Sequence, residues 1–204
     1  MGDMYDDAVD QMQTQEIDKL FGDTPKEVKM TGFLPDGYNE PSRSNYMSFN
    51  DGTNTFRVLD HAVIGWEYWT EETIDGKIKN TPHRVKEEDS IPVEKVITNK
   101  FGNLNINFFW AFPVYNFDDK RIQILEITQK TIRKAIKGFV DNKKWGDPKD
   151  YNFEVTREKT PEGKTEYSVI AEPKEVLDPT IIEQFKNMKL DMKVWMEGGD
   201  PFAK

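Results

Sequence analysis

The chain has 204 residues, of which 36% are hydrophobic and 32% are charged, and its formal net charge is −9. A composition this polar predicts one compact domain with solvated flanking segments. The absence of cysteine excludes disulfides and cysteine nucleophiles, and with only two histidines we expect no metal site and no cofactor. No apolar run is long enough to span a membrane and the N-terminus lacks a signal-peptide core, so we expect a cytoplasmic protein.

The negative charge is concentrated in the two flanks. Residues 1–40 contain ten acidic and three basic residues, and residues 172–204 contain seven and five. The segment between them contains twenty of each and is neutral. A neutral centre can still present a basic face, so the net charge does not exclude nucleic acid as a partner. The acidic flanks could serve solubility, or they could fold over a basic groove when DNA is absent.

Residues 1–45 are predicted to be a flexible acidic N-terminal segment. Residues 9–21 have a weak helical pattern of apolar positions, and residues 31–55 are rich in Gly, Pro, Asn and Ser, as in a loop. The predicted domain therefore occupies residues 46–172. Residues 173–204 are expected to add a C-terminal helix and tail.

Strand patterns begin at residue 56. Residues 56–70, FRVLDHAVIGWEYWT, predict one long or kinked strand with bends at Asp60 and Gly65. Residues 71–105 are charged and rich in turn residues, which predicts a long insertion with a short hairpin near Gly76. Such an insertion could close over a bound strand of nucleic acid as a lid.

An amphipathic helix follows two further strands. Ile132, Ile136, Phe139 and Val140 share one helical face, and Thr128 is the predicted N-cap. The remaining predictions are strands at 107–117, 121–128, 151–159 and 165–173, and a final helix at 179–188.

Three strands, a helix and two more strands are the element order of the OB-fold. That fold is a five-stranded Greek-key barrel with its helix between strands three and four. We therefore expect an all-β core of this class with flanking helical or irregular tails. OB-folds bind oligonucleotides or oligosaccharides on the face of strands two and three and with their loops. Other five-stranded barrels and α+β folds share part of this order.

Aromatic residues occupy both faces of the second predicted strand. With a period of two, Phe108 and Trp110 share one face, and Phe109 and Tyr115 share the other. A small barrel buries one face, so the other ring set must be covered by the insertion or the tails, or be open to a ligand. We expect one ring set to build the barrel and the other, on this strand and at Trp69, to form a platform on which bases stack. The sequence leaves open which set faces the ligand.

Exposed rings flanked by basic residues suit single-stranded nucleic acid. Each base stacked on a ring contributes about 1–3 kcal/mol, and Lys and Arg add salt-dependent contacts to phosphates. For each ring the alternative is core packing, and for the basic residues it is a solvated surface. The candidate nucleic-acid-binding residues are Arg57, Trp66, Tyr68, Trp69, Lys77, Lys79, Arg84, Lys100, Phe109, Trp110, Tyr115, Lys120, Arg121 and Gln123.

Four segments carry a family resemblance: FRVLDHAVIGWEYWT, FFWAFPVYNFDDKRIQILEITQKTI, WGDPKDYNFEVTR and TEYSVIAEP. Together they resemble bacteriophage-type single-stranded DNA-binding proteins with an OB-fold, over residues 44–172. RIQILEITQKTI followed by WGDP is the most specific part. The resemblance implies a non-enzymatic protein that coats single-stranded DNA during replication, recombination and repair. The best-known member carries a structural zinc whose ligands are lacking here, so no metal is carried over.

The C-terminus WMEGGDPFAK echoes the Asp-Pro-Phe-like tip of bacterial relatives. The resemblance therefore implies a partner-docking role for Asp200, Pro201 and Phe202 toward replication or recombination proteins. The match is partial, since the end is only mildly acidic and two residues follow the phenylalanine.

Several alternatives stay open from the sequence. Acid pairs at 71–72, 87–88 and 118–119 have the residue type of glycosidases, but they lie in predicted turns and charged loops, so we expect no enzyme. A carbohydrate-binding module and a protein-interaction domain are both compatible with exposed rings, and RNA could replace DNA. Salt separates these classes, because only polyanion binding should weaken steeply as salt is raised.

Overall fold

The structure is a computed structural model, which describes residues 44–74 and 76–202. Residues 42–204 form one compact unit. The predicted acidic segment 1–45, with its helical pattern at 9–21, therefore lies almost wholly outside the described residues. Among the described residues no helix is both long and apolar enough to cross a membrane.

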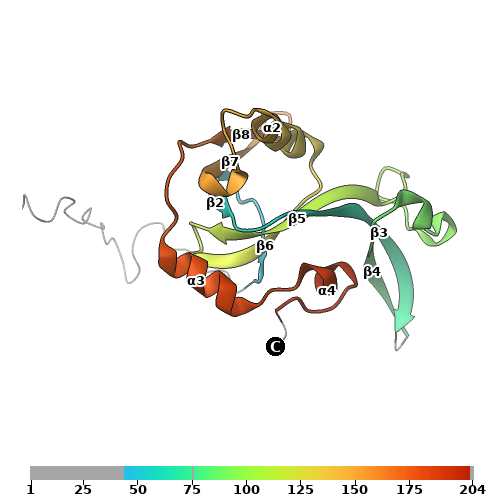
Figure 1. The fold of residues 1–204 in the computed structure, drawn as a ribbon. Helices are drawn as coiled ribbons and strands as arrows, with labels where there is room; N and C mark the ends of the chain where they lie inside the picture. Colours follow the sequence, from blue (N-terminus) through green and yellow to red (C-terminus); the bar gives the residue numbers. More distant parts are fainter. Residues whose placement is uncertain (1–43, 75, 203–204) are drawn as a thin grey trace, which may run out of the picture. The chain divides into compact units, whose positions relative to one another are not determined.

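The described part of the chain is built mainly of strands (Figure 1). Three short 3-10 turns, at residues 88–90, 93–95 and 148–150, lie in its connections. The elements are β1 (Tyr46–Met47), β2 (Gly52–Val58), β3 (Val63–Ile74), β4 (Lys77–Val85), β5 (Ile106–Asn116), β6 (Arg121–Ile127), α2 (Lys130–Asp141), β7 (Asn152–Lys159), β8 (Thr165–Ala171), α3 (Pro179–Met188) and α4 (Met192–Met196).

The first predicted strand is divided in two where Asp60 was expected to bend it. β2 ends at Val58 and β3 begins at Val63. In the gap, the Asp60 carboxylate accepts a hydrogen bond from the backbone amide of His61 at 2.8 Å, which stabilises a local turn. Gly65, the other predicted bend, instead stays within β3.

The insertion contains a much longer hairpin than the sequence predicts. β3 and β4 pair from Trp66 opposite Val85 to Ile74 opposite Lys77. The rest of the insertion returns to β3 through an isolated bridge between Thr70 and Val96. Of the strands that the structure describes, β4 pairs with β3 alone, so it forms an edge of the described sheet.

The strands form one open, mixed sheet. Its order is β1-β6-β5-β2-β7-β8, with β3 joined to β5 and β4. Among the described strands, the pairing of β1 with β6 alone is parallel. Among the described residues no pairing joins β8 back to the β6 end. The structure is therefore mainly β-sheet, as expected, but the closed five-stranded barrel is not confirmed. β1 occupies the edge of β6, and after Ala171 the chain leaves the sheet toward α3.

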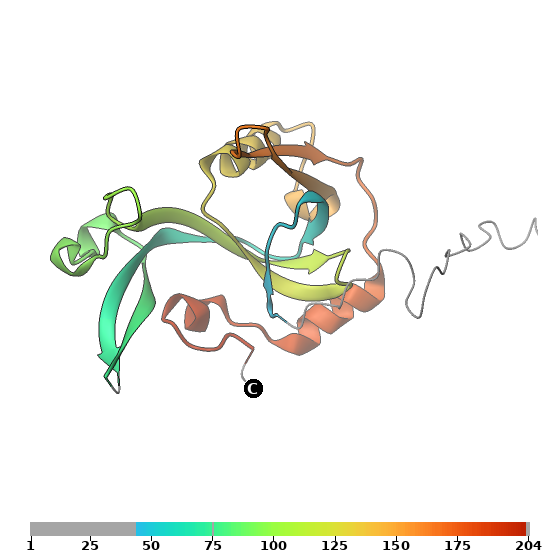
Figure 2. The same ribbon diagram turned by 180° about the vertical axis from the view of Figure 1, so that it is seen from behind.

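The main core lies between α2 and the curled sheet. Ile132 and Ile136 of α2 are buried against Phe112, Leu125 and Phe153. In Figure 1, α2, β7 and β8 lie on one side of β5 and β6, and α3 and α4 lie on the other; Figure 2 shows the same layers from behind. Helix α2 begins after Gln129, one residue later than the predicted cap.

Strands β3 and β5 therefore have two differently covered faces. The inner face carries Trp110 and Phe112 of β5 and continues into the main core. The outer face carries Phe109 and Ala111 and lies against the C-terminal segment 190–202. These two faces correspond to the two ring sets that the strand period separates.

Candidate nucleic-acid interface

A row of rings lies on the inner face beyond the main core. Cross-strand pairing places Trp66 opposite Phe108 and Ile64 opposite Trp110. The Trp66 and Phe108 rings meet edge to face with centroids 5.1 Å apart. All three rings are half-buried, and Ile64 is 54% exposed. We call Trp66, Phe108 and Trp110 the aromatic row.

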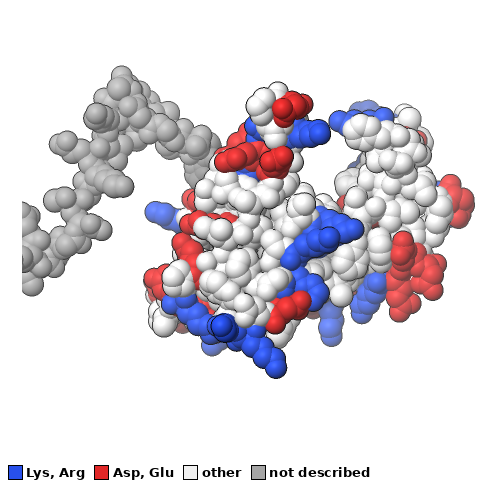
Figure 3. All heavy atoms as spheres, turned by 90° about the horizontal axis from the view of Figure 1, so that it is seen from above, with Lys and Arg blue, Asp and Glu red and all other residues white. Residues whose placement is uncertain are grey.

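Helix α2 lies beside the aromatic row and brings basic groups to it. The Arg133 guanidinium lies 5.1 Å from the centroid of the Phe108 ring and donates to the carbonyl oxygens of Phe108 and Thr128. Burial lowers the pKa of Arg133, but a guanidinium remains charged at neutral pH. Figure 3 looks down on α2, and a group of Lys and Arg side chains lies near the middle of this surface. The exposed lysines of α2 are Lys130, Lys134 and Lys137.

The insertion covers the far end of the row. Ile91 and Val96 are buried with Tyr68, and Trp66 packs partly against this cluster. Tyr68 also stacks on His83, with centroids 5.0 Å apart and an interplanar angle of 17°. Tyr68 is therefore a packing residue at the end of the row, whereas Trp66 keeps part of its ring open.

Lys100 and the ring beside it extend the insertion into solvent. Phe101 is 76% exposed, and the Lys100 ammonium lies 5.0 Å from its ring centroid. An exposed ring with an adjacent cation is suited to stacking and phosphate contact. Of the predicted basic residues, Lys100 thus combines exposure with a neighbouring ring.

The outer face, which carries the predicted site residue Phe109, is closed at that ring. Phe109 and Ala111 are fully buried because Trp195 of α4 packs on them, with the Trp195 and Phe109 ring centroids 5.5 Å apart. The expectation that Phe109 is an open ring is therefore wrong. Trp195 itself is buried as a packing residue.

Arg84 interacts with a ring and two carboxylates on the outer face. Its guanidinium lies 4.0 Å from the centroid of the Trp195 ring and pairs with Glu126 at 3.1 Å and Glu67 at 3.5 Å. Burial raises the pKa of Glu126, and Glu67 adds to this, while Arg84 opposes it. Trp69 is half-buried here and donates from its indole nitrogen to Glu67 at 2.9 Å. Two carboxylates beside Arg84 make this region unsuited to phosphate.

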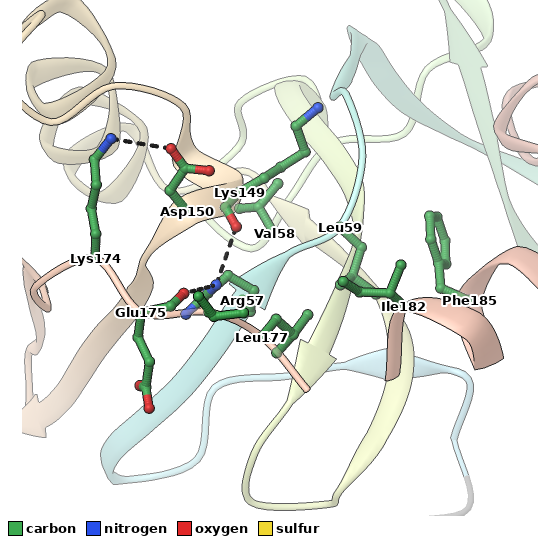
Figure 4. Close-up of a pocket in the computed structure, with 11 residues that line it drawn as sticks. Arg57, Val58, Leu59, Lys149, Asp150, Lys174, Glu175, Leu177, Ile182 and Phe185 are labelled. Carbon is green, nitrogen blue, oxygen red and sulfur yellow. Dashed lines mark hydrogen bonds and ion pairs between the residues drawn. The ribbon is translucent and has the colours of Figure 1, made fainter. Parts of the chain in front are cut away.

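Arg57 is buried at the base of a separate cavity of about 490 Å³ (Figure 4). Its Nε donates to Asn152 at 2.7 Å, and Nη1 donates to the carbonyl oxygens of Lys149 and Glu175. Burial lowers its pKa, opposed first by Glu175. These bonds fix the chain between β2 and the connection to α3. The predicted phosphate contact is wrong for Arg57, because its donors serve the fold.

Four candidates lie at the other end of β5. Gln123 is fully buried, donates to the Ser44 carbonyl at 2.8 Å and accepts from Asn116 at 2.8 Å, so it is structural. Tyr115 lies seven residues beyond Phe108, about 24 Å at 3.4 Å per residue. Lys120 lies in the next turn and Arg121 begins β6. The structure does not bring these residues to the aromatic row.

Lys77 and Lys79 are exposed at the tip of the β3–β4 hairpin. Eight residues of β3 separate Trp66 from Ile74, the partner of Lys77, which is about 27 Å at 3.4 Å per residue. The hairpin tip is thus separate from the aromatic row, although an extended polymer could reach both.

The proposed docking tip is packed against the domain. Pro201 is buried and its carbonyl accepts from the Asp191 amide at 3.2 Å. The Asp200 carboxylate accepts from the Phe202 amide at 3.0 Å, and Phe202 packs on the outer-face cluster. In this structure the three residues belong to the cover of the outer face and not to a free tail.

Sequence reasoning missed Phe108 and Arg133 as members of the site. The strand period had put Phe108 on the same face as Trp110, but only Trp110 of these two was among the candidates. Arg133 had a signal in the helix pattern, since it follows the buried Ile132 and so lies at the border of the apolar face. Comparison with protein-family models, curated proteins and solved structures finds no match to this chain.

Proposed function

We propose that the protein is a single-stranded DNA-binding protein that holds the strand along the aromatic row. The observation that carries this proposal is the alignment of three half-open rings, Trp66, Phe108 and Trp110, on one sheet face beside a basic helix. Rings offer their faces to any base, so binding in this way is largely independent of sequence. The role that fits is coating and protecting single strands during phage replication, recombination and repair.

The topology supports an OB-like relationship. Taken together, β2 and β3 pair with β5 as the first OB strand pairs with the second, and α2 stands between β6 and β7. β7 then pairs with β2, and β8 with β7. The insertion would correspond to the first long loop of that fold, one of the loops used for oligonucleotides. We infer an OB-type barrel opened on the side of β1 and β8.

The inner face suits the strand better than the outer face for a physical reason. Bases need rings that are open, and phosphates need cations that are not already paired within the fold. The inner face offers open ring surface with Lys130 and Lys134 on the adjacent helix, whereas on the outer face Arg84 is held by two carboxylates. The proposal includes no catalytic step.

The test is a titration of intrinsic tryptophan fluorescence with oligo-dT at three salt concentrations, repeated with duplex DNA and with oligo-rU. We expect quenching by the single strand that weakens as salt rises and is nearly absent with duplex. Quenching that persists unchanged at high salt would favour a carbohydrate or protein partner instead. Absence of quenching at low salt would refute the proposal.

A further inference from the structure

A second cavity opens at the α2 end of the aromatic row. Its volume is about 350 Å³, at the lower end of the range for small-ligand sites. Trp110 forms part of its wall, so the cavity is continuous with the row. Phe112, Ile136 and Val140 make the remaining surface near Trp110 apolar.

The rim of this cavity carries acceptors. Asp60 and Asp147 lie in its lining, from the turn between β2 and β3 and from the segment before β7. Asp60 accepts from the His61 amide at 2.8 Å with one oxygen. Asp147 accepts from the Lys149 amide at 2.9 Å with one oxygen, and its other oxygen lies 3.5 Å from the Lys149 ammonium. An ionised carboxylate has about four lone-pair positions, so each retains the capacity to accept from a ligand.

A cavity lined by a ring and two carboxylates favours a particular kind of base. The ring and the apolar wall suit a flat heterocycle, and the carboxylates suit one that carries an amino group. Asp and Glu accept from the exocyclic amine of cytosine, and adenine presents a similar donor. Thymine presents carbonyl oxygens there, which carboxylates repel, and the one ammonium among the described lining residues, that of Lys149, is paired with Asp147 at 3.5 Å.

We propose that this cavity is a subsite for one amino-bearing base, cytosine or adenine, at the end of the bound strand. This inference rests on the proposed function for its biological setting, but the cavity itself can be tested without any DNA strand. It adds a base preference to binding that is otherwise independent of sequence. The positions that define it are Asp60, Trp110, Val140 and Asp147.

The first test uses nucleosides, which lack phosphate. Deoxycytidine, deoxyadenosine and thymidine are titrated into the full chain while the indole N–H signal of Trp110 is followed by NMR and assigned with Trp110→Phe. We expect saturable shifts of this signal with deoxycytidine and deoxyadenosine, at affinities at least about 5-fold above that for thymidine. Equal shifts for the three nucleosides, or none, would overturn the proposal.

The second test measures the ratio of affinities for oligo-dC and oligo-dT of equal length. Asp60→Asn with Asp147→Asn keeps an oxygen for each local amide but replaces the other acceptor with a donor. The ratio should fall from at least about 5 to about 1, whereas any general gain from removing negative charge cancels in the ratio. Asp141→Asn, on the exposed end of α2, is the matched control and should leave the ratio unchanged.

A filled cavity supplies an independent variant. Val140 is 46% exposed at the cavity edge, so Val140→Trp can occupy the space without unfolding the core. It should abolish the preference for oligo-dC and retain binding of oligo-dT. Glu183→Trp, at an exposed position of α3, should leave both the preference and oligo-dT binding unchanged. A normal preference in Val140→Trp would overturn the proposal. Failure of oligo-dT to bind the wild type, with deoxycytidine still bound, would refute only the proposed function.

Discussion

The two faces of the β3–β5 pair are made of similar residues but differ in what covers them. On the inner face, Trp66, Phe108 and Trp110 remain half-open. On the outer face, Phe109 is fully buried beneath Trp195, which comes from the last fifteen residues of the chain. The comparison teaches that an aromatic strand does not determine its own exposure. A short segment distant in sequence decides which ring set is core.

The cover of the outer face is also electrostatic. Arg84 lies between the Trp195 ring and the carboxylates of Glu67 and Glu126, so a cation, a ring and two acids are packed together. A cation–ring contact contributes about 0.5–2 kcal/mol, more when water is excluded. No corresponding ion pair crosses the aromatic row among the described residues, so the inner face lacks this closure.

The largest expected effect is removal of the ring that closes the outer face. Trp195→Ala should lower the free energy of unfolding by about 3–5 kcal/mol, because it leaves a cavity above Phe109. Urea denaturation followed by circular dichroism measures this change. Val194→Ala, on the same helix but partly exposed, should stay within about 0.5 kcal/mol of wild type.

Trp195→Ala also tests whether the outer face binds DNA. If the outer face were the DNA platform, uncovering Phe109 in Trp195→Ala would raise the affinity for oligo-dT under conditions where the variant is folded. We expect an unchanged affinity, within about twofold, because stacking of a base on a ring would change it by more. A large gain would transfer the proposed interface to the outer face.

The next largest effect is expected on the affinity for oligo-dT, when tryptophans on opposite faces are compared. Trp110→Ala should weaken oligo-dT binding by about 1–3 kcal/mol, the contribution of one stacked base. Trp69→Ala, on the outer side of β3, should change the affinity by less than about twofold. Fluorescence anisotropy with labelled oligo-dT measures both. The reverse order of effects would contradict the assignment of the inner face.

A substitution at Gly65 tests how closely the outer face is packed. An added Cβ would lie 2.4 Å from the Val85 carbonyl oxygen and 2.8 Å from the Met196 methyl, so Gly65→Ala should destabilise the fold by about 1–3 kcal/mol. Gly138 in α2 has nothing within 4 Å of such a Cβ. Gly138→Ala should therefore stabilise the protein by about 0.5–1 kcal/mol. Thermal denaturation of both variants measures these changes in stability. A Gly65→Ala variant as stable as wild type would show that the outer face is loosely covered.

Most of the secondary structure could be predicted from local pattern. The strand at 107–117, the helix with Ile132 and Ile136 inward, and the break at Asp60 all arise from short-range periodicity or turn chemistry, and the structure contains them. Barrel closure could not be predicted, because it depends on whether distant strands meet. The two-residue β1 at the edge of β6 has too little sequence to give a signal.

The candidate site was predictable only in part. Period two separated the two ring sets correctly, and the possibility that a tail covers one of them was foreseen. Which set is covered depends on Trp195 reaching Phe109, a contact between residues 86 positions apart. Arg57 and Gln123 looked like surface groups because buried Arg and Gln are rare. Their burial depends on backbone acceptors supplied by other segments, which no local pattern reveals.

The smallest expected effect is a pH dependence of the free energy of unfolding that arises from Glu126 on the outer face. Burial raises the pKa of Glu126 above its ordinary value of 4.5, so the folded protein binds this proton more tightly than the unfolded chain does. Stability is therefore lost as pH rises from the ordinary pKa through the folded one, by at most about 1.4 kcal/mol per pH unit.

Glu126→Gln resembles the protonated form and should lack this loss. Its stability advantage over wild type should grow across that window and then level off in urea titrations at successive pH values. Glu183→Gln, at an exposed position of α3, should show no such trend. An advantage of Glu126→Gln that shrinks as pH rises would mean that Arg84 outweighs the cost of burial and holds Glu126 ionised on the closed face.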